Sequence, residues 1–109
     1  MVYYKKGGMD TDKVYSLPQL KDALFPLFLD YDIRKAVLFG SYGKGTATGK
    51  SDVDLLVDSS LRGLRFIGFL DEVQRALGKD VDLFDVSHIQ PDSPIDQEIR
   101  RTGVTIYEK

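Results

Sequence analysis

Two short apolar runs, separated by a polar and glycine-rich segment, constrain the fold of this chain more than any other feature of its sequence. Residues 36–39 form the first run, which ends at Gly40, and residues 53–57 form the second. Apolar runs of this length between glycine and polar residues are typical of buried strands. The segment 41–50 between them is rich in Gly, Thr and Lys and therefore predicts a loop or a short helical turn.

A helix is predicted before the first of these strands. Apolar residues recur every three or four positions over residues 17–31, and Ser16 and Gln19 have the spacing of a capping box. Pro26 lies inside this pattern, and a proline inside a helix removes a backbone hydrogen bond and crowds the preceding turn. We therefore expect a helix that is kinked or broken near Phe25, with an irregular second half.

Helices and strands alternate in the rest of the chain. A helix is predicted over residues 61–77, and Gly78 after it suits a left-handed cap. The expected buried face of this helix consists of Leu64, Ile67, Leu70, Val73, Gln74 and Leu77. A strand at 81–86, a helix at 93–102 and a last strand at 104–107 complete the pattern. The predicted fold class is α/β (α+β), a small mixed sheet flanked by helices.

Length and composition limit the domain organisation and the classes of partner. The 109 residues, of which 42% are hydrophobic, suffice for one core, so we expect a single domain at 16–109 behind an N-terminal arm at 1–15. A formal net charge of −2 argues against stable nucleic-acid binding. The sequence has neither an apolar stretch of roughly 18 residues nor a signal-peptide core, so we expect no membrane association and a cytoplasmic protein.

The absence of cysteine restricts the metals that this chain can bind. Any metal ligand must be an oxygen atom or the single histidine, His88, and this favours a hard cation such as Mg²⁺. A lone histidine after a strand is more often a surface or capping residue than a ligand, and we interpret His88 in that way.

Two carboxylates stand at the start of the second predicted strand. Asp52 and Asp54 are two residues apart, so their side chains project from the same face of the strand. They repel each other, and a bound divalent cation would relieve the repulsion. Taken alone, the pair is explained more simply by Asp52 capping a turn and Asp54 facing water. Asp82, which interrupts the apolar third strand, is the candidate for a third metal ligand; Asp85, on the opposite face, is the alternative.

The glycine-rich segment after the first strand predicts a phosphate-binding turn. Gly40 ends the strand and Ser41 begins the turn, so we expect the backbone N–H groups there to be free to bind a phosphate. Gly43 and Gly45 leave room for a ligand, and Lys44 adds a cation.

A competing motif occurs further along the same segment. Gly49, Lys50 and Ser51 match the end of a P-loop, which requires a leading glycine at residue 44 and a helix after the serine. Residue 44 is lysine and a strand comes after Ser51. The sequence therefore excludes a P-loop.

Taken together, these residues resemble the minimal nucleotidyltransferases (MNT) of the DNA polymerase beta-like superfamily. Their pattern is Gly-Ser, a glycine-bearing stretch, Ser-Asp-x-Asp-Leu and a third Asp on a later strand. It is matched here by Gly40, Ser41, Gly45, Ser51, Asp52, Asp54, Leu55 and Asp82, within residues 37–86. Lys44 stands where such proteins often have Arg, which keeps the charge but loses bidentate geometry.

The resemblance implies a transferase that uses two Mg²⁺ ions and ATP. Asp52 and Asp54 would bind both metal ions, and Asp82 would bind the catalytic one and help take the proton from the acceptor hydroxyl. Gly40 and Ser41 would bind the β- and γ-phosphates, and the rest of the nucleotide-binding set would be Lys44, Gly45 and Ser51.

The resemblance also implies a partner. Stand-alone domains of this kind are often antitoxins paired with a HEPN-domain ribonuclease toxin, and the expected reaction is AMPylation of a tyrosine of that toxin. The alternatives are an antitoxin that only binds its toxin, and transfer to a small hydroxyl compound such as an aminoglycoside. Phe66 and Phe69 widen the apolar surface of helix 61–77, which suits a protein partner. An arm containing Tyr3 and Tyr4 would cover that surface equally well.

Overall fold

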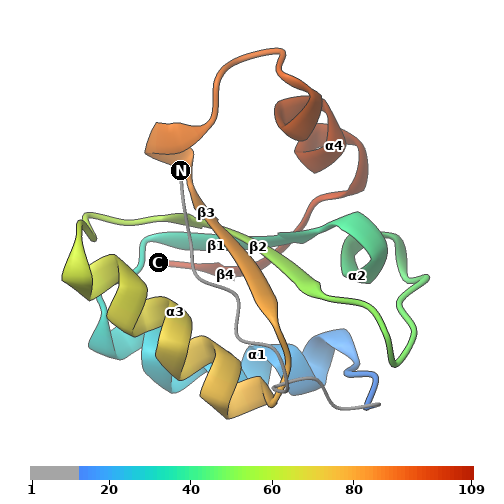
Figure 1. The fold of residues 1–109 in the computed structure, drawn as a ribbon, viewed down its shortest axis with the longest axis horizontal. Helices are drawn as coiled ribbons and strands as arrows, with labels where there is room; N and C mark the ends of the chain where they lie inside the picture. The colour runs from blue at the N-terminus through green and yellow to red at the C-terminus, as the bar shows by residue number, and fades with distance from the viewer. Residues whose placement is uncertain (1–12) are drawn as a thin grey trace.

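A four-stranded mixed sheet, ordered β3-β2-β1-β4, organises residues 13–109, which are the residues that the computed structural model describes (Figure 1). The strands are β1 (Lys35–Phe39), β2 (Val53–Asp58), β3 (Val81–Asp85) and β4 (Val104–Glu108). β1 pairs antiparallel with β2 and with β4, whereas β2 and β3 are parallel. A parallel pair needs a crossover connection, which α3 (Leu64–Leu77) supplies. The predicted mixed sheet flanked by helices is confirmed.

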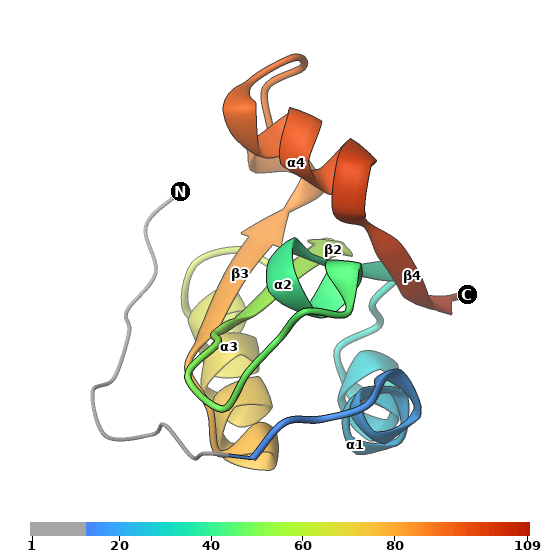
Figure 2. The ribbon, with the colours of Figure 1, turned by 90° about the vertical axis from the view of Figure 1, so that its right-hand side faces the viewer.

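Helices lie on both sides of this sheet. α1 (Leu17–Asp30) and α3 cover one face, and α4 (Pro94–Thr102) lies on the other (Figures 1 and 2). A short helix, α2 (Gly40–Lys44), comes directly after β1, and a 3-10 turn, η1 (Val86–His88), comes directly after β3. The strand predicted at 81–86 therefore ends one residue earlier. No helix within residues 13–109 is long and apolar enough to cross a membrane.

The first helix begins as predicted and continues further than predicted. Ser16 accepts a hydrogen bond from the Gln19 backbone and the Gln19 side chain accepts one from the Ser16 backbone, which completes the capping box. The expected break near Phe25 is wrong, because α1 runs through Pro26 to Asp30. Leu24 and Phe28, on either side of the proline, are fully buried. Their burial offsets the backbone hydrogen bond that Pro26 cannot make.

The third helix, α3, buries a different face from the one predicted. Its buried residues are Phe66, Phe69, Leu70, Val73, Gln74 and Leu77. Leu64 is 89% exposed and Ile67 is 39% exposed, so the expected stripe is wrong at these two positions. The sequence allows both stripes, and aromatic packing decides between them: the Phe69 ring contacts the rings of Phe28 and Tyr31. The apolar width of this helix therefore leaves Leu64 and Ile67 at the surface.

This assignment of faces predicts very different costs for two substitutions on one helix. Phe69→Ala removes a fully buried ring and should lower the free energy of unfolding by about 3–5 kcal/mol. Leu64→Ala should change it by less than about 0.5 kcal/mol, because the side chain is solvated. Urea denaturation of both variants measures the difference. Equal losses would contradict this orientation of α3.

The beginning of the described chain lies against the end of α3. The hydroxyl of Tyr15 donates a hydrogen bond to the backbone oxygen of Leu77. The rest of the expected N-terminal arm, including Tyr3 and Tyr4, lies outside the described residues. His88 is exposed and packs edge-on against Phe66, as expected for a surface residue.

Candidate active site

The parallel pairing of β2 with β3 brings together two of the predicted carboxylates. Asp54 is the second residue of β2, Asp82 is the second residue of β3, and the two are register partners. Both are partly buried, and their side chains share a hydrogen bond. They lie on the face of the sheet opposite to the fully buried Val53, Leu55 and Val57. The carboxylates therefore face away from α1 and α3.

Asp54 is costly to ionise in this setting. Burial raises the pKa of Asp54 to about 7. The hydrogen bond with Asp82 and the negative charge of Asp82 raise this pKa as well. The charges of Asp52 and Glu98 raise this pKa further. A divalent cation would offset all of these charges. The site thus has the electrostatic character that favours cation binding.

The residues present fit Mg²⁺ in particular. Within residues 13–109, no three acidic or histidine side chains already converge as a complete metal centre. Mg²⁺ does not need such a centre, because it commonly binds through one or two carboxylates, with substrate phosphates and water completing its coordination. Adjacent Asp54 and Asp82, with Asp52 just before β2, supply hard oxygen ligands of that kind.

Gly40 closes one side of the carboxylate pair. Its φ is +68°, in the left-handed region, and a Cβ at this position would lie 2.2 Å from Oδ2 of Asp54. Phe39, the preceding residue, is the register partner of Asp54 across β1 and β2. Only glycine lets the backbone turn here while passing so close to the carboxylate. The glycine is therefore required by two independent features of the site.

The backbone N–H of Gly40 is not free, and the expectation of a free N–H at this residue is wrong. It donates a hydrogen bond of 2.9 Å to Oγ1 of Thr102, at the end of α4. This partner lies 62 residues away in sequence, so nothing in the sequence around Gly40 indicates it. Ser41 is the second residue of α2, and no side chain caps that helix at Phe39.

The other predicted nucleotide-binding residues lie further along the same segment. Lys44 is exposed at the end of α2, and Gly45 caps this helix with a φ of +79°. Gly45 lines a hollow of about 230 Å³ with Tyr15, among other residues. The Ser51 hydroxyl accepts a hydrogen bond from the Thr48 backbone and stabilises the turn before β2. Described contacts thus connect Gly40 directly with the carboxylate pair, whereas those of Gly45 and Ser51 are with the surrounding loop.

Two residues that the sequence did not single out support the loop before Asp52. Lys79 is fully buried, and its Nζ donates a hydrogen bond of 3.0 Å to the backbone oxygen of Gly49. The backbone oxygen of Asp80 accepts a hydrogen bond from Val53. A buried lysine is rare enough to be informative once seen, but its burial has no local signature in the sequence.

Asp85, the alternative to Asp82, has a structural role. It is 2% exposed and lies on the opposite face of β3. Its carboxylate accepts hydrogen bonds from the hydroxyl of Ser59 and from the backbone and hydroxyl of Ser87. It therefore caps η1 from inside the protein and lies away from the pair formed by Asp54 and Asp82.

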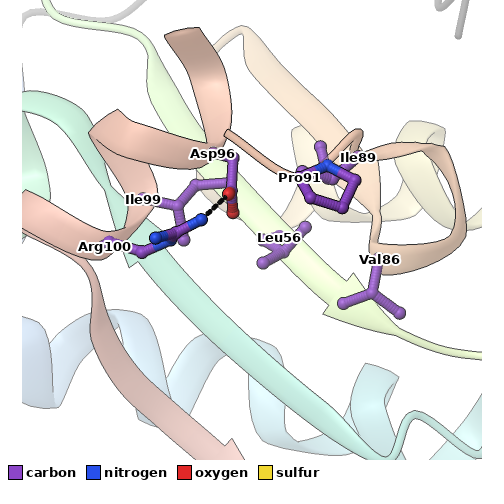
Figure 3. Close-up of a pocket in the computed structure, with 7 residues that line it drawn as sticks. All are labelled: Leu56, Val86, Ile89, Pro91, Asp96, Ile99 and Arg100. Carbon is purple, nitrogen blue, oxygen red and sulfur yellow. Dashed lines mark hydrogen bonds and ion pairs between the residues drawn. The ribbon is translucent and has the colours of Figure 1, made fainter. Parts of the chain in front are cut away.

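An apolar cavity of about 340 Å³ continues along the same sheet face as the carboxylates. Leu56, two residues after Asp54, forms part of its floor. Figure 3 shows its lining: Leu56, Val86, Ile89, Pro91, Ile99 and the ion pair between Asp96 and Arg100. Ile99 of α4 lines this cavity, and the charge of Glu98, on the same helix, acts on Asp54.

The Gly40 turn lies against paired carboxylates on a mixed sheet, and comparison with known proteins identifies the family that has this arrangement. Residues 24–109 match the family model described as Polymerase beta, Nucleotidyltransferase. The chain belongs to this family, which confirms the resemblance read from the sequence.

Individual relatives agree with this assignment. The chain is 30% identical, over 80 residues, to the protein named "Putative protein adenylyltransferase MJ0435" of Methanocaldococcus jannaschii, covering 70% of this chain and 84% of that protein. A crystal structure of a toxin-antitoxin with AMP-PNP matches with a TM-score of 0.69 and 25% identity, covering 82% of this chain and 73% of that one.

A third match shows the fold alone. It comes from the structure of a tri-AMPylated Shewanella oneidensis HEPN toxin in complex with an MNT antitoxin. The TM-score is 0.65 at 21% identity, and the match covers 85% of this chain and 73% of that chain.

Proposed function

We propose that this protein is a Mg²⁺-dependent adenylyltransferase that moves AMP from ATP to a tyrosine hydroxyl of a partner HEPN ribonuclease toxin, and that it acts as the antitoxin of that pair. One observation carries the proposal: Asp54 and Asp82 are register partners beside the Gly40 turn. The transferase class comes from the family. The AMP donor and the toxin partner are supported by what two relatives are named for: a putative protein adenylyltransferase and a toxin-antitoxin complex with AMP-PNP. We also place its action in the cytoplasm, where ATP is available.

In this mechanism the carboxylates would bind metal, and one of them accepts the proton of the acceptor hydroxyl. Asp52 and Asp54 would hold both Mg²⁺ ions, and Asp82 would hold the catalytic one. These carboxylates would thereby bring Mg²⁺ to the site, and the chemistry that the metal would supply when bound is neutralisation of the charge that develops on the phosphates and activation of the attacking hydroxyl. The acceptor oxygen attacks the α-phosphorus, the bond to the β-phosphate oxygen breaks, and pyrophosphate leaves. The proton of the acceptor hydroxyl passes to Asp82.

The turn after β1 positions the nucleotide. Ser41 binds the terminal phosphates, and Lys44, Gly45 and Ser51 complete the binding segment around them. Gly40 contributes its conformation and its close approach to Asp54 rather than its N–H, which is bonded within the protein. Catalysis of this type depends on positioning and charge neutralisation, which a fixed turn and a fixed carboxylate pair provide.

A protein acceptor fits the rest of the surface. α1 and α3 cover one face of the sheet, so the acceptor must approach from the face that carries the carboxylates (Figure 2). Leu64 and Ile67 are exposed on α3 beside a hollow of about 640 Å³ that Arg62 and His88 also line. Exposed apolar side chains next to a hollow are typical of surfaces that a protein partner covers, so this patch on α3 would be a contact surface separate from the entry to the carboxylates.

The proposal is tested by incubating the protein with ATP labelled at the α-phosphate, Mg²⁺ and the product of the neighbouring gene, which the proposal expects to be a HEPN protein. We expect label on the HEPN protein, and no label with Asp52→Ala or in excess EDTA. A tyrosine-to-phenylalanine change in the toxin should remove the acceptor. Neutralisation that survives Asp52→Ala, with no label on the toxin in any sample, would refute transfer and leave an antitoxin that acts by binding.

A further inference from the structure

Thr102 connects the end of α4 to the start of the candidate nucleotide site. It is 6% exposed, and its Oγ1 makes two hydrogen bonds. The hydroxyl donates to the backbone oxygen of Glu98 at 2.8 Å and accepts from the backbone N–H of Gly40 at 2.9 Å. A hydroxyl has one hydrogen, so the bond to Glu98 leaves its oxygen lone pairs directed at Gly40 as acceptors. The two bonds thus fix each other's direction.

The backbone around Thr102 is also fixed, by contacts with α2 and β1. A Cβ on Gly43 would lie 2.2 Å from the backbone oxygen of Thr102, so α2 and the end of α4 are in direct backbone contact. Val104, two residues later, pairs with Leu38 of β1. Figure 2 shows α2 lying next to the end of α4. Thr102 is therefore a fixed point against which the turn after β1 packs.

The turn needs such a fixed point. α2 has five residues, too few for a helix to be stable by itself, and no side chain caps it at Phe39. Gly40 must also keep a left-handed conformation while it passes Oδ2 of Asp54. A glycine has more backbone freedom than any other residue, so its conformation has to be imposed by contacts. The bond from its N–H to Thr102 is the described polar contact that does this.

We propose that Thr102 is a positioning residue for the nucleotide site, which holds the Gly40 turn in register with Asp54 through the hydroxyl bond to the Gly40 amide. Thr102 lies outside residues 37–86, which carry the family motif. It contacts neither nucleotide nor metal in this assignment and acts only through Gly40. The inference rests on the proposed function in one respect, namely that nucleotide binds at this turn.

The test replaces the hydroxyl without changing the shape of the side chain. Thr102→Val keeps the volume and leaves the Gly40 N–H without its acceptor, and Thr102→Ser restores the hydroxyl. Thr105→Val, at an exposed position of β4, is the matched control for a Thr-to-Val change. The Kd of AMP-PNP with Mg²⁺ is measured by calorimetry, with melting curves to correct for the folded fraction. A buried amide without a partner is strongly unfavourable, so in Thr102→Val the Gly40 turn should leave its position beside Asp54. Because nucleotide is proposed to bind at this turn, we expect the Kd of Thr102→Val to rise about tenfold.

The expected pattern is loss with Thr102→Val and wild-type affinity with both Thr102→Ser and Thr105→Val. A purely structural role would lower the melting temperature of Thr102→Val and leave its Kd unchanged after correction, and this outcome overturns the proposal. Loss of affinity in Thr102→Ser as well would also overturn it, because the hydroxyl would then not be the cause.

Hydrogen exchange at the Gly40 amide tests the contact in the wild-type protein, whether or not Thr102→Val folds. Without nucleotide, the Gly40 N–H should exchange at least about tenfold more slowly than in an unstructured peptide, because it is buried and bonded. Exchange at the unstructured rate would overturn the proposal. Failure of the wild-type protein to bind AMP-PNP would instead refute the proposed function, so the two ideas fail by different observations.

Discussion

Asp54→Asn is expected to lower AMP transfer on the order of a thousandfold and, without divalent cations, to stabilise the folded protein at pH 8. The substitution keeps the size of the side chain and removes its charge. Activity falls because a metal ligand is lost where charge neutralisation supplies most of the catalysis. Stability rises because the folded protein no longer has to hold an ionised carboxylate beside Asp82.

The direction of the stability change depends on pH. The pKa of Asp54 is raised to about 7 in the folded protein, against about 3.9 in an unfolded chain. Between these values the folded state binds more protons than the unfolded state, so wild-type stability falls as pH rises through this window. Asn does not titrate. The gain should therefore be present at pH 8 and small at pH 4.

The size of this gain is limited by solvent. Asp54 is only partly buried, so we expect about 1 kcal/mol at pH 8 rather than the value of the full shift. For a domain of this length that corresponds to roughly 4–8 °C in melting temperature. Melting curves in EDTA at pH 4 and pH 8 measure it. Adding Mg²⁺ should raise the melting temperature of the wild type at pH 8 and leave that of Asp54→Asn nearly unchanged.

Asp58→Asn is the matched control for this substitution. Asp58 lies on the same face of β2, four residues further on, and its carboxylate pairs with Arg34 at 2.8 Å. Loss of this ion pair should lower the free energy of unfolding by less than about 1 kcal/mol, because the pair is exposed. Asp58→Asn should leave AMP transfer intact. If Asp54→Asn behaved like Asp58→Asn in both assays, Asp54 would not be part of a metal site.

The sequence predicts the fold and the carboxylates because their signals are local. Buried strands, capping residues and an Asp-x-Asp pair are each defined within a few residues, and the parallel register then brings Asp54 and Asp82 together. The break predicted at Pro26 is wrong because helix propensity is a local quantity, whereas the burial of Leu24 and Phe28 depends on the whole domain. The face of α3 was ambiguous for the same reason, since both stripes share Leu70, Val73, Gln74 and Leu77.

The features of the site that the sequence does not reveal are contacts between distant segments. Thr102 and Gly40 are 62 residues apart, and Lys79 and Gly49 are 30 residues apart. Each pair joins a side chain to a backbone group, and any residue can provide that backbone group. Such pairing leaves no pattern in a single sequence. For this reason the sequence could not indicate that the Gly40 N–H is already bonded to Thr102.

Gly40→Ala should be the most damaging small substitution in the nucleotide-binding segment, and Gly45→Ala provides a stability control at a second glycine with positive φ. Both glycines have positive φ, +68° at Gly40 and +79° at Gly45. Alanine in the left-handed region costs about 1–2 kcal/mol, and both variants carry this cost. A Cβ on Gly45 meets no atom within 4 Å, whereas one on Gly40 would lie 2.2 Å from Oδ2 of Asp54.

The difference in the free energy of unfolding between the two variants therefore isolates the contact with Asp54. The clash can be relieved only if the turn or the Asp54 side chain moves, and we expect a further cost of about 1–3 kcal/mol, as in other overpacked sites. Displacement of Asp54 should also reduce AMP transfer by about a hundredfold, since small displacements at a reacting centre have effects of that order. Urea denaturation and the labelled-ATP assay measure both quantities. If Gly40→Ala and Gly45→Ala lost equal stability and kept equal activity, the close approach of Gly40 to Asp54 would have no functional role, and the left-handed backbone alone would explain the glycine.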